Sequence, residues 1–333
     1  MNTAEWTPER LFETSGGYWT ACVLHAAVTL DVCTALGERK AGVRDVAADI
    51  KAAERGTELL LNALAAMQLI SKTGEEYCNT PFSASFLSKD SPQYAGYMIR
   101  HHSHLMSSWD RLAEAVKSGE PVRNRESRDD EELREGFLMG MFNLASGVAP
   151  RVAEEIDLSN RSHLLDMGGG PGTYAIHFCL KNPQLKASVY DLPTTRPFAE
   201  KIIARFDLSD RIRFIPGDYL KDDIEGSYDA VWLSHVLHSE DPSSCERMLR
   251  KAVSVLEPGG TILVHDFILN NAMDGPVFPA LFALNMLVNT PRGRSYSEEQ
   301  IIDMLSRVGA SDLQRTSFHG PNDSGIILGT RPR

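Results

Sequence analysis

A glycine-rich turn between an apolar run and a helix-forming stretch constrains this chain of 333 residues more than any other feature. Residues 164–173 read Leu-Leu-Asp-Met-Gly-Gly-Gly-Pro-Gly-Thr, and Gly168, Gly170 and Gly172 occupy alternate positions. Glycine has no Cβ, so it adopts positive φ and lets a ligand approach the backbone, while the helix that follows offers free N–H donors. The pattern predicts a strand, a tight turn that can hold a ligand, and a helix that begins at Tyr174.

The spacing of these glycines helps to distinguish between two classes of ligand. Turns of this kind hold both dinucleotides and S-adenosylmethionine, but the dinucleotide fingerprint G-x-G-x-x-G needs its third glycine where Thr173 stands. Here the third glycine is Gly172, and the match is G-x-G-x-G. A tight turn in an α/β sheet without any ligand gives the same pattern, so residues further along the chain have to decide.

Apolar runs alternate with helical stretches after the turn. This alternation predicts an α/β fold with a Rossmann-like, doubly wound and mostly parallel sheet, which binds ligands at the carboxyl ends of its strands. Besides the strand that enters the turn, we expect strands at residues 187–190, 212–215, 230–233, 261–264 and 325–328.

The first hundred residues have a different pattern. Apolar residues at helical spacing predict helices at 14–36, 43–50 and 58–69, and the segment 70–79 has the alternation and central turn of a β-hairpin. This order of elements is typical of a winged helix-turn-helix.

A winged helix often binds DNA, but the charges argue against that function here. Residues 1–100 carry nine Lys and Arg against twelve Asp and Glu, and the helix that would enter the groove, Thr57 to Leu69, has no basic residue. The net charge of the chain is −11, which also disfavours an anionic membrane surface. We therefore expect neither nucleic acid nor membrane as a partner. Instead we expect a homodimer in which the apolar faces Val23–Leu30 and Leu60–Met67 are buried against a second subunit.

The cysteines and the N-terminus indicate a cytoplasmic protein. The five cysteines are scattered with no C-x-x-C pair, which is typical of reduced structural thiols. The first residues lack the basic and apolar segments of a signal peptide.

The middle of the chain contains a histidine-rich helix and a polar run. His101, His102 and His104 have no carboxylate or cysteine at ligand spacing beside them, so we expect no metal site. The polar run predicts a linker at 118–135 between a dimerisation domain, 1–117, and a ligand-binding domain, 136–333.

Acidic residues follow the second and third strands of the predicted sheet. Asp191 stands about 20 residues beyond the glycine turn, where a carboxylate accepts hydrogen bonds from both hydroxyls of a ribose. Asp218 can accept a hydrogen bond from an adenine amino group, and Tyr219 can cover the ring. Either carboxylate alone could be a helix N-cap, but together with the glycine turn they favour an adenosine site.

Histidines follow the fourth strand, and an aspartate ends the fifth. A histidine at a strand end that faces a cofactor suits proton removal near neutral pH, because its unperturbed pKa is ~6.5. His235 and His238 both stand there, and their spacing alone does not choose between them. Asp266 could hold the ring of the base and stabilise the imidazolium.

Several of these segments together resemble a known family. Over nearly its whole length the chain is similar to the S-adenosylmethionine-dependent O-methyltransferases of the caffeate, flavonoid and acetylserotonin type, whose bacterial relatives act on polyketides and other aromatic metabolites. The family carries an N-terminal winged-helix domain used for dimerisation. The matching segments are residues 164–173, Asp191-Leu192-Pro193, Gly217-Asp218, Val236-Leu237-His238, Glu257-Pro258-Gly259-Gly260, and a Trp-x-x-Leu and Gly-x-Pro linker at 109–121.

The resemblance implies roles for individual residues. His238 is expected to be the base, and Asp266 matches a glutamate that orients the base. The residues expected to bind the cofactor are Gly168, Gly170, Asp191, Leu192, Asp218, Tyr219 and Ser234, and those expected to line the acceptor pocket are Phe137, Met141, Asn285, Met286 and Asn289.

Two positions depart from the family pattern. Plant members follow the histidine with Asp-Trp, where this chain has Ser239-Glu240, and a second acidic orienter is replaced by Ser295. These departures leave one carboxylate to orient the base.

The sequence thus predicts a homodimeric, metal-independent enzyme that transfers the sulfonium methyl of S-adenosylmethionine to a hydroxyl of a small aromatic metabolite. The transfer is an in-line displacement, so the protein mainly aligns the reactants while His238 takes the proton. One alternative is a C-methyltransferase, or a relative that uses the same cofactor site without methylation. Another is a winged-helix regulatory protein that senses the cofactor.

Overall fold

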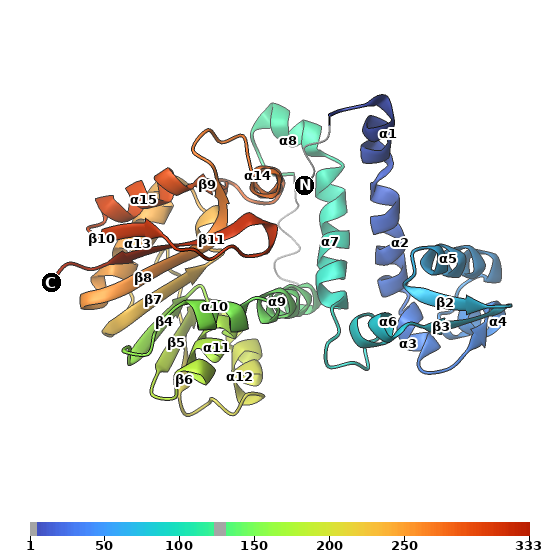
Figure 1. The fold of residues 1–333 in the computed structure, drawn as a ribbon, viewed down its shortest axis with the longest axis horizontal. Coiled ribbons are helices and arrows are strands. Elements are labelled where there is room, and N and C mark those ends of the chain that lie inside the picture. The colour runs from blue at the N-terminus through green and yellow to red at the C-terminus, as the bar shows by residue number, and fades with distance from the viewer. Residues whose placement is uncertain (1–4, 123–130) are drawn as a thin grey trace. The chain divides into compact units, whose positions relative to one another are not determined.

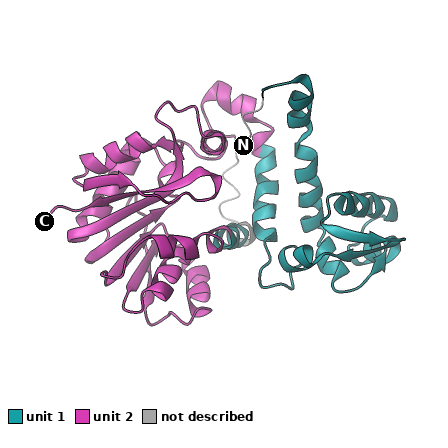
Figure 2. Cartoon of the chain, in the orientation of Figure 1, with its two compact units in different colours: residues 1–107, 131–143 teal, residues 108–130, 144–333 magenta. Residues whose placement is uncertain are grey.

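The computed structural model describes residues 5–122 and 131–333, which form two compact units (Figures 1 and 2). The first contains the residues up to Ser107 together with 131–143, and the second contains the remainder. The predicted domains 1–117 and 136–333 divide the chain differently, and residues 123–130 of the predicted linker lie outside the described residues.

The first unit consists of helices and a small sheet. The predicted order of helices followed by a hairpin is present, and a short third strand pairs with the hairpin in the order β1-β3-β2. Its elements are α1 (Pro8–Gly16), α2 (Tyr18–Thr29), α3 (Val32–Leu36), β1 (Ala41–Gly42), α4 (Val43–Asp49), α5 (Glu54–Ala66), β2 (Ile70–Thr73), β3 (Glu76–Asn79), α6 (Pro81–Phe86), α7 (Gly96–Trp109) and α9 (Glu131–Ser146), the last two of which end in the second unit.

The apolar faces that the sequence assigns to a subunit interface have a different role. Val28 of α2 and Leu61 and Leu64 of α5 are buried within the core of the first unit itself. A group of exposed apolar side chains lies earlier, before and along α1 and at the start of α2. Its members are Trp6, Leu11, Phe12, Tyr18 and Trp19, and Leu30, Leu59, Phe82 and Phe137 are exposed elsewhere in the unit.

The second unit contains the predicted α/β fold. Strand residues that are apolar on both sides, with helices between them, require a sheet covered on both faces. Its elements are α8 (Leu112–Ser118), α10 (Ala149–Glu155), β4 (His163–Met167), α11 (Thr173–Lys181), β5 (Lys186–Asp191), η2 (Pro193–Thr195), α12 (Arg196–Ala204), β6 (Ile212–Pro216), β7 (Tyr228–Ser234), η3 (Leu237–Ser239), α13 (Pro242–Ser254), β8 (Leu256–Leu269), α14 (Val277–Asn289), β9 (Tyr296–Ser297), α15 (Glu298–Arg307), β10 (Ser311–Arg315), η4 (Pro321–Asp323) and β11 (Ser324–Thr330).

The strands form an eight-stranded sheet in the order β10-β11-β8-β7-β4-β5-β6, with β9 paired to β8 (Figure 1). Strands β4 to β8 are parallel, whereas β11 runs antiparallel to β8 and β10 antiparallel to β11. The chain order reverses between β4 and β7, and ligands bind sheets of this type at that switch point. No helix in the described parts of the chain is both long and apolar enough to span a membrane.

Candidate active site

The glycine turn follows β4 directly. Gly168, Gly170 and Gly172 all have positive φ, at 71°, 53° and 78°, a conformation in which a Cβ is strained. A Cβ on Gly168 would also lie 2.7 Å from a methyl carbon of Val236, whereas one on Gly170 would meet open space. Helix α11 then begins at Thr173, one residue before the predicted start.

Asp166, the last residue but one of β4, is buried beneath the turn. Its Oδ2 accepts a hydrogen bond from the Ala175 N–H at 3.2 Å, but its Oδ1 is buried without a hydrogen-bond partner. Burial raises the pKa of this carboxyl to about 7, and the nearby charge of Asp191 adds to the effect. Sequence reasoning gave Asp166 no role, although its place directly before the turn was a signal.

Asp191 ends β5 and holds the turn in place. Its Oδ2 accepts from the Gly170 N–H at 2.8 Å, and its Oδ1 accepts from the Leu192 N–H at 2.7 Å and the Thr195 hydroxyl at 2.9 Å. Burial raises its pKa, and these hydrogen bonds oppose the rise. A carboxylate has about four acceptor positions, so one remains for a further donor. The Leu192 side chain beside it is exposed.

Asp218 and Tyr219 follow β6. The Asp218 carboxylate accepts from the Leu220 N–H at 2.9 Å and from Lys221 Nζ at 2.8 Å, and the Lys221 bond lowers its pKa in spite of partial burial. The Tyr219 hydroxyl donates to Glu240 at 3.2 Å. Glu240, one of the two residues in place of Asp-Trp, is thus tied to the segment expected to cover the adenine.

The pairing of β7 with β8 brings the histidines and Asp266 together. Ser234 lies opposite His265 in the register, and its hydroxyl contacts His265 Nδ1 at 3.0 Å. The residues just beyond this pair, His235 and Asp266, therefore meet at the same edge of the sheet. Burial lowers the pKa of His265 well below its usual value, so this ring is neutral.

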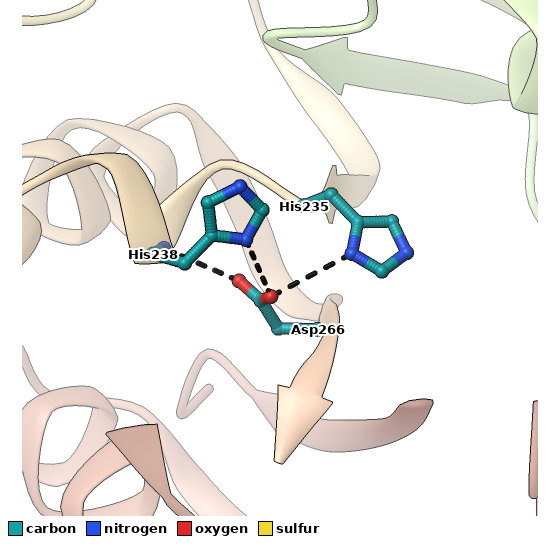
Figure 3. Close-up of side chains that lie close together, drawn as sticks. All are labelled: His235, His238 and Asp266. Carbon is teal, nitrogen blue, oxygen red and sulfur yellow. Dashed lines mark hydrogen bonds and ion pairs between the residues drawn. The ribbon is translucent and has the colours of Figure 1, made fainter. Parts of the chain in front are cut away.

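His238 and Asp266 form a buried pair (Figure 3). His238 Nδ1 lies 2.7 Å from Asp266 Oδ1, and the His238 backbone N–H points at Oδ2 from 3.3 Å. Burial alone would raise the pKa of Asp266, but the charge of His238, its hydrogen bond to the carboxylate and the nearby ring of His235 hold that pKa far below its ordinary value. A permanently charged carboxylate fixes the His238 tautomer with Nδ1 protonated, which leaves Nε2 as the acceptor.

His235 faces the same carboxylate and is more than a remote packing residue. Its Nδ1 lies 3.6 Å from Asp266 Oδ1, and its backbone has a φ of 56°. Its side chain is 28% exposed, against 10% for His238. The structure therefore distinguishes the two histidines: only His238 is within hydrogen-bond distance of Asp266.

An aromatic wall, defined here as Phe267, Phe278 and Phe282, lies beside His238. The Phe282 ring is 4.7 Å from the His238 ring, edge to face, and Phe267 lies 4.8 Å from Phe282 and 4.9 Å from Phe278. All three rings are half-buried. Sequence reasoning missed this wall, although the i, i+4 spacing of Phe278 and Phe282 was visible.

Helix α14 continues from the wall to a group of amides. Trp109 Nε1 donates to Asn285 Oδ1 at 3.0 Å, and Asn289 Nδ2 donates to the same oxygen at 3.0 Å. Asn289 Oδ1 is buried without a hydrogen-bond partner, and Met286 is buried. The other two expected pocket residues, Phe137 and Met141, belong to the first unit.

Ser295, which stands in place of a second acidic orienter, has a structural contact. Its buried hydroxyl donates to the Pro279 carbonyl at 2.7 Å, which ties the segment before β9 to α14. Asp266 is thus the carboxylate on which the orientation of His238 depends.

The residues at the strand ends fit S-adenosylmethionine. The turn leaves open space at Gly170, the unpaired Oδ1 of Asp166 lies beneath the turn, and Asp191 keeps an acceptor position toward it. The fold and this site define a class of protein: an α/β enzyme that binds an adenosine-containing cofactor at the switch point of its sheet.

Comparisons with known proteins identify the family. Residues 109–311 match the O-methyltransferase domain, and residues 12–89 match the O-methyltransferase dimerisation domain. The 3-hydroxy-5-methyl-1-naphthoate 3-O-methyltransferase of Streptomyces sahachiroi is 30% identical over 97% of this chain and 95% of its own. The tetracenomycin polyketide synthesis 8-O-methyl transferase TcmO of Streptomyces glaucescens is 28% identical over 98% of this chain and 97% of its own.

A solved structure agrees in fold. Human N-acetylserotonin methyltransferase in complex with S-adenosylmethionine has a TM-score of 0.88 and 28% identity, and the match covers 100% of both chains. The chain belongs to the S-adenosylmethionine-dependent O-methyltransferases that carry an N-terminal dimerisation domain. The predicted fold class, enzyme class and cofactor are confirmed.

Proposed function

We propose that this enzyme methylates a hydroxyl on a flat aromatic metabolite, with His238 as the general base. S-Adenosylmethionine supplies, when bound, a methyl group on a positively charged sulfur. The observation that carries the proposal is the buried His238–Asp266 pair beside three phenylalanine rings.

His238 would take the hydroxyl proton at Nε2. Asp266 holds Nδ1–H at 2.7 Å, so the ring cannot present Nδ1 to the acceptor, and its charge stabilises the imidazolium that results. Asp266 is in this sense a positioning residue. The glycine turn and Asp191, with Leu192, Asp218, Tyr219 and Ser234 on neighbouring strand ends, would bind the cofactor.

The aromatic wall supports a planar acceptor. Phenylalanine rings at about 5 Å spacing offer both edges and faces to another ring, which adds to the energy of apolar burial. The names of the two Streptomyces relatives specify a naphthoate and a polyketide product. Asn289 Oδ1, which is free of protein donors, would accept a hydrogen bond from a polar group on such a molecule. Phe137, Met141, Asn285 and Met286 remain predicted pocket residues.

The chain contains a dimerisation domain, and we infer that it forms a homodimer through the exposed apolar residues of the α1–α2 segment. Phe12 is 72% exposed and Trp19 67%, and a pair of such side chains on one segment is unusual for a free surface. Light scattering should report twice the chain mass for the wild type and a smaller mass for a Phe12→Asp, Trp19→Asp variant. A wild-type monomer at micromolar concentration would contradict the homodimer.

A product assay tests the acceptor class. The enzyme is incubated with S-adenosylmethionine labelled in the methyl group and with matched series of naphthols, polycyclic phenols, aliphatic alcohols and aromatic amines. We expect label on oxygen with the fused-ring phenols, read from the methyl shift in the NMR spectrum. Turnover only with alcohols that lack a ring would refute the proposal, and label on carbon would support the C-methyltransferase alternative.

A further inference from the structure

Three potential metal ligands converge at the carboxyl ends of β7 and β8. A ring nitrogen of His235, a ring nitrogen of His238 and a carboxylate oxygen of Asp266 all lie within 4.8 Å of one another, and Nδ1 of each histidine faces the carboxylate (Figure 3). Among residues 5–122 and 131–333, no other trio of His, Cys, Asp or Glu side chains approaches so closely.

The ligand types narrow the choice of ion. Two imidazoles and one carboxylate suit zinc and its neighbours in the first transition series, whereas calcium and magnesium prefer oxygen ligands. A tetrahedral zinc ion with bonds of ~2.0–2.1 Å separates its ligand atoms by about 3.3 Å. The separations from Asp266 Oδ1 to the two histidines are 2.7 Å and 3.6 Å, on either side of that value.

His235 provides an independent reason to expect an ion. Its Nδ1 is buried and has no hydrogen-bond partner, although it faces the charged carboxylate. The ring is held there by packing against Phe267 at 4.4 Å and by the backbone hydrogen bond from the His235 N–H to the His265 carbonyl at 2.8 Å. A left-handed backbone on a histidine is uncommon and costs free energy, and it directs this nitrogen into the cluster.

The surroundings already orient the carboxylate. Asp266 Oδ1 accepts from the Phe267 N–H at 2.8 Å, and the His238 N–H lies 3.3 Å from Oδ2. In metal sites, hydrogen bonds of this kind from neighbouring groups fix the orientation of the side chains that bind the ion. The partial exposure of His235 leaves a path by which a hydrated ion reaches the cluster.

We propose that His235, His238 and Asp266 form an inhibitory site for a divalent transition-metal ion such as zinc. The ion bonds to Nδ1 of His238, so the proton that Nδ1 shares with Asp266 moves to Nε2 and the imidazole stays neutral. Nε2 then carries a hydrogen and has no lone pair to accept a proton from the substrate hydroxyl. The inhibition rests on the proposed role of His238 as base, whereas the binding of the ion does not.

Calorimetry tests the site without any methyl acceptor. Zinc chloride is titrated into the full-length wild type and into two matched variants, His235→Asn and His104→Asn. Asparagine tolerates the left-handed backbone of position 235, and His104 is exposed on α7 and is not one of the three converging ligands. We expect one zinc ion per wild-type chain, with affinity reduced roughly a hundredfold in His235→Asn and unchanged in His104→Asn. S-Adenosylhomocysteine binding serves as the check that each variant is folded.

A methyl-transfer assay then tests the inhibition. Zinc should stop the wild type and a chelator should restore it, while His235→Asn should keep most of its turnover and need at least tenfold more zinc for the same inhibition. Equal zinc affinity in His235→Asn and wild type would overturn the site. Zinc that binds through His235 without slowing turnover would overturn the inhibition. A failure of His238 as base appears separately, as a His238→Ala variant that stays active.

Discussion

Asp166 and Asp266 lie toward the carboxyl ends of two strands of the same sheet and are 1% and 3% exposed, but their surroundings shift their pKa values in opposite directions. Burial raises the pKa of Asp166 to about 7, because one backbone N–H is all that it receives in return. Asp266 is equally buried, yet the two histidines beside it, His238 and His235, hold its pKa far below the ordinary value. Partners, rather than depth, decide the charge of a carboxyl at this edge of the sheet.

This difference separates two parts of the site: a histidine half, His238 with Asp266, and a glycine half, the glycine turn with Asp166 and Asp191. In the histidine half the hydrogen-bonding groups are paired within the chain, since His238 Nδ1 and Asp266 Oδ1 lie 2.7 Å apart. In the glycine half they are not, because Asp166 Oδ1 lacks a donor and Asp191 has spare acceptor capacity. An incomplete half of this kind is what a cofactor with hydroxyl and ammonium donors requires.

Local sequence patterns predicted the fold because each depends only on residues that are close together in the chain. The glycine turn, the alternation of strands and helices and the hairpin at 70–79 depend on neighbours in the chain, and the structure confirms them. Strand β10 escaped prediction because Leu313 is the one apolar residue among its five, and β1 and β9 have two residues each.

Features that depend on residues far apart in the chain were harder to predict from the sequence. The unpaired oxygen of Asp166 depends on which groups are absent around it, and no sequence pattern records that. The spacing of His235 and His238 did not choose between them, and the family resemblance alone named His238. The structure separates them through the left-handed backbone at 235 and the η3 helix that follows it. The apolar faces of α2 and α5 were assigned to a dimer because no local pattern shows that these helices pack on each other and on the predicted hairpin.

The largest effect is expected at the base. His238→Ala should lower turnover roughly 10²–10⁴-fold, because it removes the proton acceptor. Affinity for S-adenosylhomocysteine should stay nearly unchanged, since all the residues expected to bind the cofactor except Ser234 lie on other strand ends. His235→Asn, assayed beside it, should lose far less. Near-normal turnover of His238→Ala would mean that proximity alone or another base performs the reaction.

Asp266→Asn should weaken both function and fold at neutral pH. The amide cannot stabilise a charged imidazole, so turnover should fall to a level between wild type and His238→Ala. Breaking one partner of a buried pair also lowers the free energy of unfolding, by roughly 3 kcal/mol. Because the pKa of Asp266 is depressed, its stabilisation is present above pH ~4 and lost as the pH falls further. Urea unfolding measures the loss of unfolding free energy in the variant. An equal loss at pH 5 and pH 8 fits a depressed pKa for Asp266, and a loss that grows between pH 5 and pH 8 contradicts it.

Asp166→Asn should raise the free energy of unfolding at neutral pH, whereas Asp266→Asn should lower it. The raised pKa means that the folded state holds a proton which the unfolded state releases, so the stability contribution of Asp166 falls as the pH rises from ~4 toward 7. A neutral amide avoids this loss. The gain in unfolding free energy should be near zero at pH 4, rise through pH 7 and reach at most ~4 kcal/mol at pH 8. A variant less stable than wild type at pH 8 would show that Asp166 is charged and paired in the native protein.

Asp191→Ala tests the incomplete half directly. The substitution removes the acceptor that faces the glycine turn together with its bond to Gly170, so S-adenosylhomocysteine should bind more weakly by about 1.5–3 kcal/mol, or roughly 10–150-fold. Thr195→Ala is the matched control, because it removes a neighbouring hydrogen bond to the same carboxylate but keeps the carboxylate. Unchanged affinity in Asp191→Ala would place the cofactor elsewhere.

Ser295→Ala should have the smallest effect, and it tests whether Asp266 orients the base unaided. The Ser295 hydroxyl donates to the Pro279 carbonyl and makes no hydrogen bond to His238. Its loss should cost about 1 kcal/mol of unfolding free energy, the usual contribution of one hydrogen bond, and should leave turnover and its pH profile unchanged. Ser295→Glu is the informative companion, because it restores the acidic residue of the family pattern at a buried position. If turnover fell in Ser295→Ala without any loss of stability, the Ser295 hydroxyl would share in positioning His238. Asp266 would then not orient the base alone.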